Sequence, residues 1–110
     1  SRSYSLAAAE IEAIKYSHMA RLDALVEQIR AEFAAQPEGK YRSLMVYAYL
    51  NCDRFYELEE ACENDMQKVI EEIRSFQRKA GEPEELADHV WNAYKAEKTY
   101  LLSYYCVKLR

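Results

Sequence analysis

Glycine and proline occur at only two places in this chain of 110 residues. Pro37 and Gly39 form one cluster, and Gly81 and Pro83 form the other. Glycine supplies the left-handed conformation that ends many helices, and proline is tolerated at the first position of a helix. The clusters therefore predict three long segments, about 4–35, 41–80 and 83–109, each free of helix breakers.

Apolar side chains recur every three or four positions in these segments. In the first, the stripe consists of Ile11, Ile14, His18, Leu22, Leu25, Ile29 and Phe33. This spacing keeps one face of a helix against its partners, as in a bundle or a coiled coil. In the second segment the stripe continues through Asn51–Arg54, which predicts one helix of about 40 residues, ~60 Å long. We predict an all-α fold of three long helices in an antiparallel, elongated bundle, with 1–110 as a single helical-bundle domain.

Charged residues predict which helices are neighbours. A short turn at 80–83 makes the second and third helices an antiparallel hairpin, in which facing residue numbers sum to about 163. Acidic residues at 82–88 then face Arg74, Arg78 and Lys79. Lys95, Lys98 and Lys108 face a mainly acidic stretch at 57–68. Such pairs set the register of a helical hairpin although each contributes little energy.

Aromatic residues gather in the first half of the second helix and near the end of the third. The expected partner-binding residues are Tyr47, Tyr49, Phe55, Tyr56, Tyr100, Tyr104 and Tyr105. Three helices of unequal length leave some of these rings uncovered, and tyrosine is enriched at interfaces. We expect a protein partner or a second copy of the chain, as a two-fold homodimer, to pack there. Alternatively, the rings complete the bundle's own core, with their hydroxyls in water.

Four acidic residues have a spacing that metal sites use: Glu60 and Glu63, then Glu85 and Asp88. This pattern resembles the ExxE…ExxD motif of the all-α nucleotide pyrophosphatases, the MazG-like group. The resemblance implies a Mg²⁺-dependent pyrophosphatase in which these four carboxylates hold the metal ion. Along the predicted hairpin, however, the two pairs are ~22 Å apart, and Mg²⁺ needs its ligands at about 2.1 Å. Only a dimer would bring them together, and a solvated acidic face is the simpler interpretation.

Histidine and cysteine residues predict little chemistry. His18 lies on the apolar stripe of the first helix, so we expect a packed, hydrogen-bonded core residue. Cys52, Cys62 and Cys106 fall on or beside apolar faces, where a buried thiol is unreactive. A cysteine nucleophile also needs a nearby base. We therefore predict no catalytic residue and no cofactor, except Mg²⁺ in the pyrophosphatase alternative.

The overall charge, the length of the apolar runs and the cysteine spacing narrow the class of protein that the sequence predicts. Fifteen basic and nineteen acidic residues give a net charge of -4, which argues against nucleic-acid binding. No apolar run approaches the ~20 residues that span a bilayer, so no membrane association is expected. Three cysteines without CxxC spacing fit a reducing compartment, and we expect the cytoplasm. We predict a small helical protein-interaction module, an adaptor, subunit or regulator, with the pyrophosphatase as the alternative.

Overall fold

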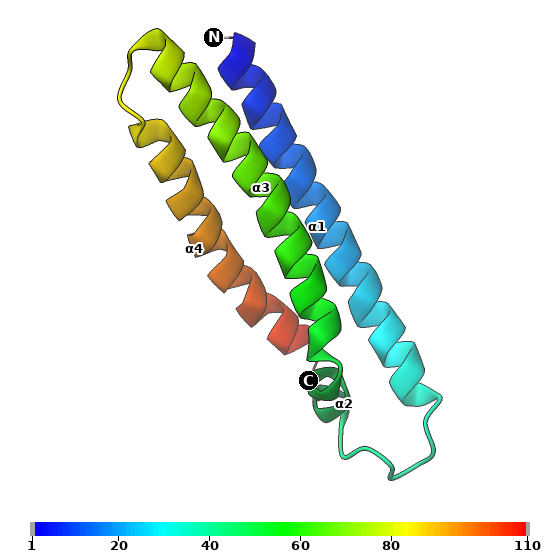
Figure 1. The fold of residues 1–110 in the computed structure, drawn as a ribbon. Helices are drawn as coiled ribbons and strands as arrows, with labels where there is room; N and C mark the ends of the chain where they lie inside the picture. Colours follow the sequence, from blue (N-terminus) through cyan, green and yellow to red (C-terminus); the bar gives the residue numbers. More distant parts are fainter. Residues whose placement is uncertain (1, 110) are drawn as a thin grey trace.

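The computed structural model describes the backbone of residues 2–109 and the side chains of this range except those of residues 2, 102–104, 106 and 107. Within this part the chain forms four helices: α1 (Arg2–Ala34), α2 (Leu44–Leu50), α3 (Cys52–Ala80) and α4 (Glu85–Lys108). Helices α1 and α3 pack side by side in opposite directions, and α4 returns along α3 (Figure 1). The described molecule measures 63 × 18 × 18 Å. The predicted all-α, elongated, antiparallel bundle is therefore confirmed.

Gly81 ends α3 in the way that the glycine pattern predicts. Its φ of 69° lies in the left-handed region. The N–H of Gly81 donates to the carbonyl of Arg78 at 3.1 Å, and the N–H of Glu82 donates to that of Gln77 at 2.9 Å. The buried Gln77 side chain also donates to the carbonyl of Pro83 at 2.8 Å. The two backbone bonds satisfy the carbonyls of Gln77 and Arg78 near the end of α3, and the side-chain bond ties α3 to the turn.

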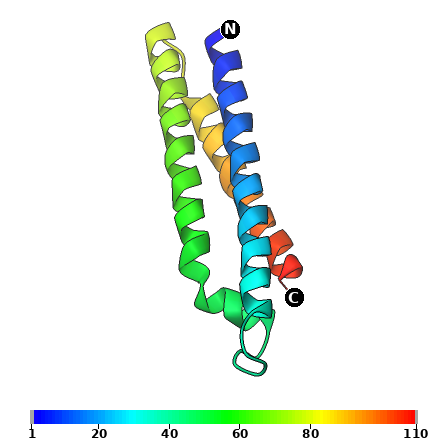
Figure 2. The same ribbon diagram turned by 90° about the vertical axis from the view of Figure 1, so that its right-hand side faces the viewer.

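The prediction of one continuous helix over 41–80 is wrong. The chain forms α2 and α3 instead, and Figure 2 shows α2 set at an angle to α3. Helix α2 begins at Leu44, which is later than predicted. The Oγ of Ser43, the residue before it, accepts a hydrogen bond from the N–H of Val46 at 3.2 Å. Capping of this kind satisfies one of the free N–H groups at a helix start.

Asn51 causes the break between α2 and α3. In a continuous helix its backbone N–H would bond to the carbonyl of Tyr47. Here the side-chain Nδ2 of Asn51 donates to that carbonyl at 2.9 Å, while the backbone N–H turns to Ala48 at 3.1 Å. Asparagine competes with the backbone in this way because its short amide reaches nearby carbonyls. The apolar spacing continues across the break, so the spacing does not reveal that a helix ends there.

The described side chains form two apolar cores in the bundle. The first core contains Ala7, Ile11, Cys62, Met66, Val69, Ile70, Ile73, Ala87 and Tyr94. The second core contains Leu22, Leu25, Val26, Ile29, Tyr47, Ala48, Tyr105 and Leu109. On α1, the buried His18 lies between Ile11 of the first core and Leu22 of the second. The bundle therefore has a polar boundary near its middle.

Ion pairs confirm the predicted register at the turn end of the hairpin. Arg78 pairs with Glu84 at 2.7 Å. Arg74 pairs with Asp88 at 3.0 Å. Both pairs follow the expected pairing rule closely.

The register prediction is wrong at the other end of α4. Lys108 was expected to face the acids of α3, but its Nζ lies 3.1 Å from Asp23 of α1. The hydroxyl of Tyr105 donates to the same carboxylate at 3.0 Å. The end of α4 therefore contacts α1, which an argument based on the α3–α4 hairpin alone does not consider.

Candidate functional site

An apolar groove lies where α2, the start of α3 and the end of α4 meet. Its volume is about 210 Å³. Its lining consists of Leu22, Met45, Ala48, Tyr49, Cys52, Phe55, Tyr56, Glu59, Leu101, Tyr105 and Leu109. We call this hollow the aromatic groove. The break at Asn51 helps to form it, because a turned α2 and the first turns of α3 face the same space.

Two tyrosines form an exposed rim around the aromatic groove. Tyr49 and Tyr56 are 73% and 70% exposed, and the neighbouring Leu50 is 61% exposed. Phe55 is half-buried and packs against the second core. Contiguous apolar surface of this kind usually marks a binding site in soluble proteins. Three of the residues that the sequence assigns to a partner surface, Tyr49, Phe55 and Tyr56, therefore lie together.

Tyr47 and Tyr105 lie in the second core rather than at a free surface. Tyr47 packs its ring edge-on against Tyr41, with ring centres 4.8 Å apart, and its hydroxyl donates to Glu32 at 3.2 Å. Tyr105 is buried and forms part of the groove's lining. These two rings complete the bundle's own core, as in the alternative interpretation. Their hydroxyls donate to Glu32 and Asp23, however, whereas that interpretation placed them in water.

Tyr100 and Tyr104 are the other two aromatic residues that the sequence assigns to a partner surface. Tyr100 is 74% exposed and lines a different cavity, of about 280 Å³, between α1 and α4. The side chain of Tyr104 lies outside the described residues.

A polar layer separates the two cores, with His18 buried and Glu59 and Lys98 half-buried. It consists of His18 from α1, Glu59 from α3 and Lys98 from α4. The Nε2 of His18 lies 3.1 Å from Oε1 of Glu59, and the Nζ of Lys98 lies 2.9 Å from Oε2 of the same carboxylate. Burial raises the pKa of Glu59, but the two cations outweigh it and leave the pKa below its ordinary value. Burial lowers the pKa of Lys98. The carboxylates of Glu59 and Glu63 have a larger opposite effect, so the pKa of Lys98 is raised.

Of the three residues in the polar layer, His18 has the largest change in pKa. Burial lowers the pKa of His18, but the neighbouring Cys62 and Glu59 side chains outweigh it and raise the pKa from 6.5 to about 9. The ring is therefore cationic at neutral pH, with a proton on each nitrogen. Nε2 meets Glu59, whereas Nδ1 is buried and has no hydrogen-bond partner in the described part of the chain. The prediction of a packed, hydrogen-bonded core histidine is confirmed for one nitrogen only.

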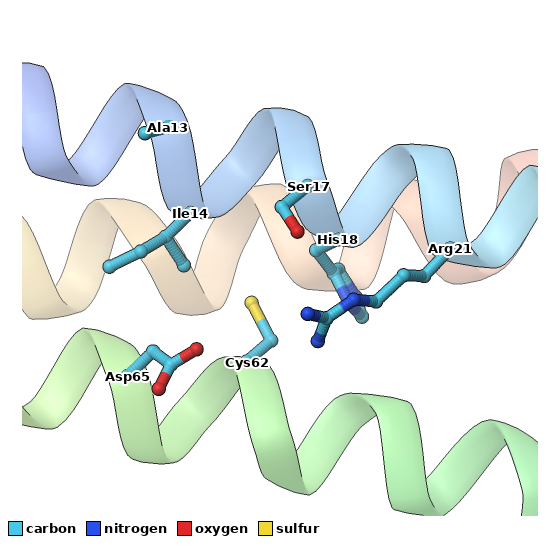
Figure 3. A pocket seen from close by; sticks show the side chains of 7 residues that line it. All are labelled: Ala13, Ile14, Ser17, His18, Arg21, Cys62 and Asp65. Atoms are coloured by element: carbon cyan, nitrogen blue, oxygen red, sulfur yellow. The ribbon is translucent and has the colours of Figure 1, made fainter.

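A small polar pocket opens beside His18, between α1 and α3. Its volume is about 240 Å³ and its lining is Ala13, Ile14, Ser17, His18, Arg21, Cys62 and Asp65. Figure 3 shows the Cys62 sulfur turned from α3 toward α1 and the Arg21 guanidinium reaching into the same space. We call this hollow the thiol pocket. The cavity between α1 and α4 reaches His18 and Cys62 from the other side, where the Tyr94 hydroxyl is also buried without a partner in the described part of the chain.

The four acidic residues of the possible metal site lie apart. Asp88 pairs with Arg74, and Glu63 lies 3.6 Å from Lys98. Arg74 and Glu63 are eleven residues apart on α3, which is a rise of ~16 Å. Glu60 and Glu85 are exposed. Among the described residues, no group of three or more His, Cys, Asp or Glu side chains is arranged to hold a metal ion.

Sequence reasoning missed the surroundings of Cys62. It predicts burial, and Cys62 is indeed 4% exposed. It assigns the thiol an apolar face, because Cys62 continues the stripe of α3, and it does not place His18 of α1 beside it. A signal was present in the stripe of α1, where a histidine replaces an aliphatic residue and therefore requires a polar partner on a facing helix.

None of the helices in the described part of the chain is both long enough and apolar enough to cross a membrane. Comparison with known protein families, with curated proteins and with solved structures finds no match to this chain.

Proposed function

We propose that this protein is a helical interaction module that binds a protein partner, or a second copy of itself, through the aromatic groove. The observation that carries the proposal is the combination of a formed apolar hollow with the exposed rings of Tyr49 and Tyr56 at its rim. Rings at a rim add apolar area, and their hydroxyls keep a contact with water.

The shape of the groove favours a helix as the bound element. A hollow between packed helices accepts the apolar face of an amphipathic helix, whose side chains at three- and four-residue spacing enter it. A second copy also fits, because the exposed side chains of Tyr49, Leu50 and Tyr56 can meet the same side chains of a second copy across a two-fold axis. Large aromatic side chains near the centre of an interface carry much of its binding energy. Tyr49 and Tyr56 are therefore the residues on which affinity should depend most.

Site-specific photocrosslinking tests the proposal. A photoreactive phenylalanine analogue replaces Tyr49 in one variant and Tyr16 in the other, and both are irradiated in native cells. Tyr16 is the matched control, because it is 80% exposed on α1 and lines neither the aromatic groove nor the thiol pocket. We expect a discrete protein adduct, or a crosslinked homodimer, at position 49 and none at position 16. Equal labelling at both positions, or none at either, contradicts the proposal.

A second measurement separates self-association from a different partner. Sedimentation equilibrium at micromolar concentration gives the mass of the wild-type chain and of a Tyr49→Glu, Tyr56→Glu variant. A wild-type mass above 12.9 kDa that returns to 12.9 kDa in the variant identifies the second copy as the partner. If the wild-type chain is a monomer, the adduct that is crosslinked at position 49 contains another protein.

A further inference from the structure

We propose that Cys62 is a peroxide-reactive thiol whose oxidation His18 assists, with Glu59 as the residue that positions the histidine ring. The site would take hydrogen peroxide or a hydroperoxide of similar size and would form a sulfenic acid on Cys62. The thiol pocket is a different cavity from the aromatic groove, although Glu59 also lines the groove.

The ring of His18 is held in the orientation that the reaction needs. Glu59 accepts the Nε2 proton at 3.1 Å, which fixes one nitrogen. His18 and Cys62 line the same two cavities, so the ring and the sulfur are neighbours. His18 is 6% exposed, and its Nδ1 is buried without a partner in the described part of the chain. A buried polar atom with no partner requires an explanation, and a reacting group is one of the recognised explanations.

The chemistry of the ring agrees with this geometry. Cys62 and Glu59 raise the pKa of His18 to about 9 against the effect of burial, which favours a proton on both ring nitrogens at neutral pH. Cys62 lies close enough to His18 to raise the pKa of the ring, so the sulfur and the ring are within reach of each other. A base, a nucleophile and a third group that orients the base form the usual arrangement of an activated nucleophile.

The proposed step balances as follows. In the reactive form of the site, the sulfur of Cys62 is a thiolate beside the protonated Nδ1 of His18. The sulfur attacks one oxygen of hydrogen peroxide, a sulfur–oxygen bond forms and the oxygen–oxygen bond breaks. The leaving hydroxide takes the Nδ1 proton and departs as water. Sulfur is oxidised by two electrons to a sulfenic acid, the peroxide is reduced, and His18 returns to its neutral form.

The size of the thiol pocket selects the oxidant. A volume of about 240 Å³ holds several water-sized molecules. Cys62 is 4% exposed, so bulky reagents reach it poorly while a small peroxide enters. Cys52 is ten residues away on the same helix, a rise of ~15 Å. That separation exceeds the span of a disulfide, so the sulfenic acid does not condense with Cys52.

The first experiment compares the native and the unfolded chain. In a Cys52→Ser, Cys106→Ser variant, Cys62 is the single thiol. Samples taken during exposure to hydrogen peroxide are quenched with catalase and unfolded in urea that contains dimedone, and the trapped sulfenic acid is measured by mass spectrometry. We expect native Cys62 to react at least about tenfold faster than the same chain unfolded in urea. A thiol that is buried but not activated reacts more slowly in the native chain than in the unfolded chain. That result overturns the proposal, and it does not depend on any variant of His18.

The second experiment changes the two histidines in the same background. His18→Gln is expected to lower the native rate by about tenfold or more. His89→Gln is the matched control, because His89 is exposed on α4, and it should leave the rate unchanged. Far-ultraviolet circular dichroism confirms that each variant is helical. An unchanged rate in folded His18→Gln overturns the role of the histidine, and if that variant fails to fold, the native-to-unfolded comparison still decides.

Discussion

The Nε2 of His18 lies 3.1 Å from the Oε1 of Glu59 at the boundary between the two apolar cores. Lys98 completes the layer from α4, so each of the three long helices contributes one charged side chain to it. A shift of any helix by one turn would bury an unpaired charge, which is costly. The layer therefore helps to specify the register of the bundle, a role that buried polar residues have in some helical assemblies.

The first prediction is that stability falls as the pH rises from about 6.5 to 9. Glu59 and Cys62 raise the pKa of His18 to about 9 in the folded chain, whereas an unfolded histidine titrates near 6.5. A raised pKa stabilises the fold fully below the unfolded value, and this contribution disappears as the pH rises through the folded value. We expect a loss on the order of 2 kcal/mol, measured by urea unfolding across this range.

His18→Gln provides the comparison for this pH dependence. The variant lacks the titrating ring, so its stability should change less between pH 6.5 and 9 than that of the wild type. His89→Gln should keep the wild-type dependence. Parallel curves for wild type and His18→Gln would show that the ring is not stabilised as a cation.

The second prediction concerns the left-handed residue that ends α3. Gly81→Val should destabilise the protein by about 1–2 kcal/mol, because a β-branched residue resists a φ of 69°. No atom lies within 4 Å of the position that a Cβ would take, so the cost comes from the backbone and not from a clash. Gly81→Asn should cost less, since asparagine tolerates this conformation better. Equal melting temperatures for the two variants would contradict this explanation.

The third prediction concerns the cap of α2. Ser43→Ala removes the acceptor of the Val46 N–H and should cost about 1 kcal/mol. In a domain of this size that loss lowers the melting temperature by roughly 5 °C. Ser43→Asp keeps an acceptor and should stay within a few degrees of the wild type. A short helix such as α2 depends on its cap more than a long one, because nucleation is costly.

Most of the fold follows from local sequence signals. The stripes of α1 and α3 identify helices, Gly81 marks a stop, and Arg74 faces Asp88 as charge alone predicts. The break at Asn51 does not follow from such signals. It depends on one side-chain amide that donates to the carbonyl of Tyr47 while the apolar spacing continues. Single hydrogen bonds of this kind leave no periodic trace.

The candidate sites were less accessible to sequence reasoning. Aromatic richness identifies Tyr49, Phe55 and Tyr56 as neighbours, but it does not distinguish them from the buried Tyr47 and Tyr105. That difference depends on hydroxyl partners such as Asp23, which lies on a helix distant in sequence. The proximity of His18 and Cys62 depends in the same way on the register of α1 against α3, and the hairpin argument does not address that pair of helices.

The last prediction tests the polar layer as a unit. Glu59→Leu leaves the cations of His18 and Lys98 without the carboxylate that both contact, and it should cost about 3 kcal/mol. Replacing all three residues, as His18→Leu, Glu59→Leu and Lys98→Met, removes the buried charges together and joins the two cores. That variant should recover most of the lost stability, because well-packed apolar residues often replace a buried ion pair without net cost.

Urea unfolding of the wild type, the single variant and the triple variant measures this recovery. Glu60→Leu is the matched control, since Glu60 is the exposed neighbour of Glu59, and it should change stability little. A triple variant weaker than Glu59→Leu would show that the layer stabilises the fold beyond satisfying its own charges. The expected recovery would show that the layer adds little net stability of its own, which agrees with a role in specifying helix register.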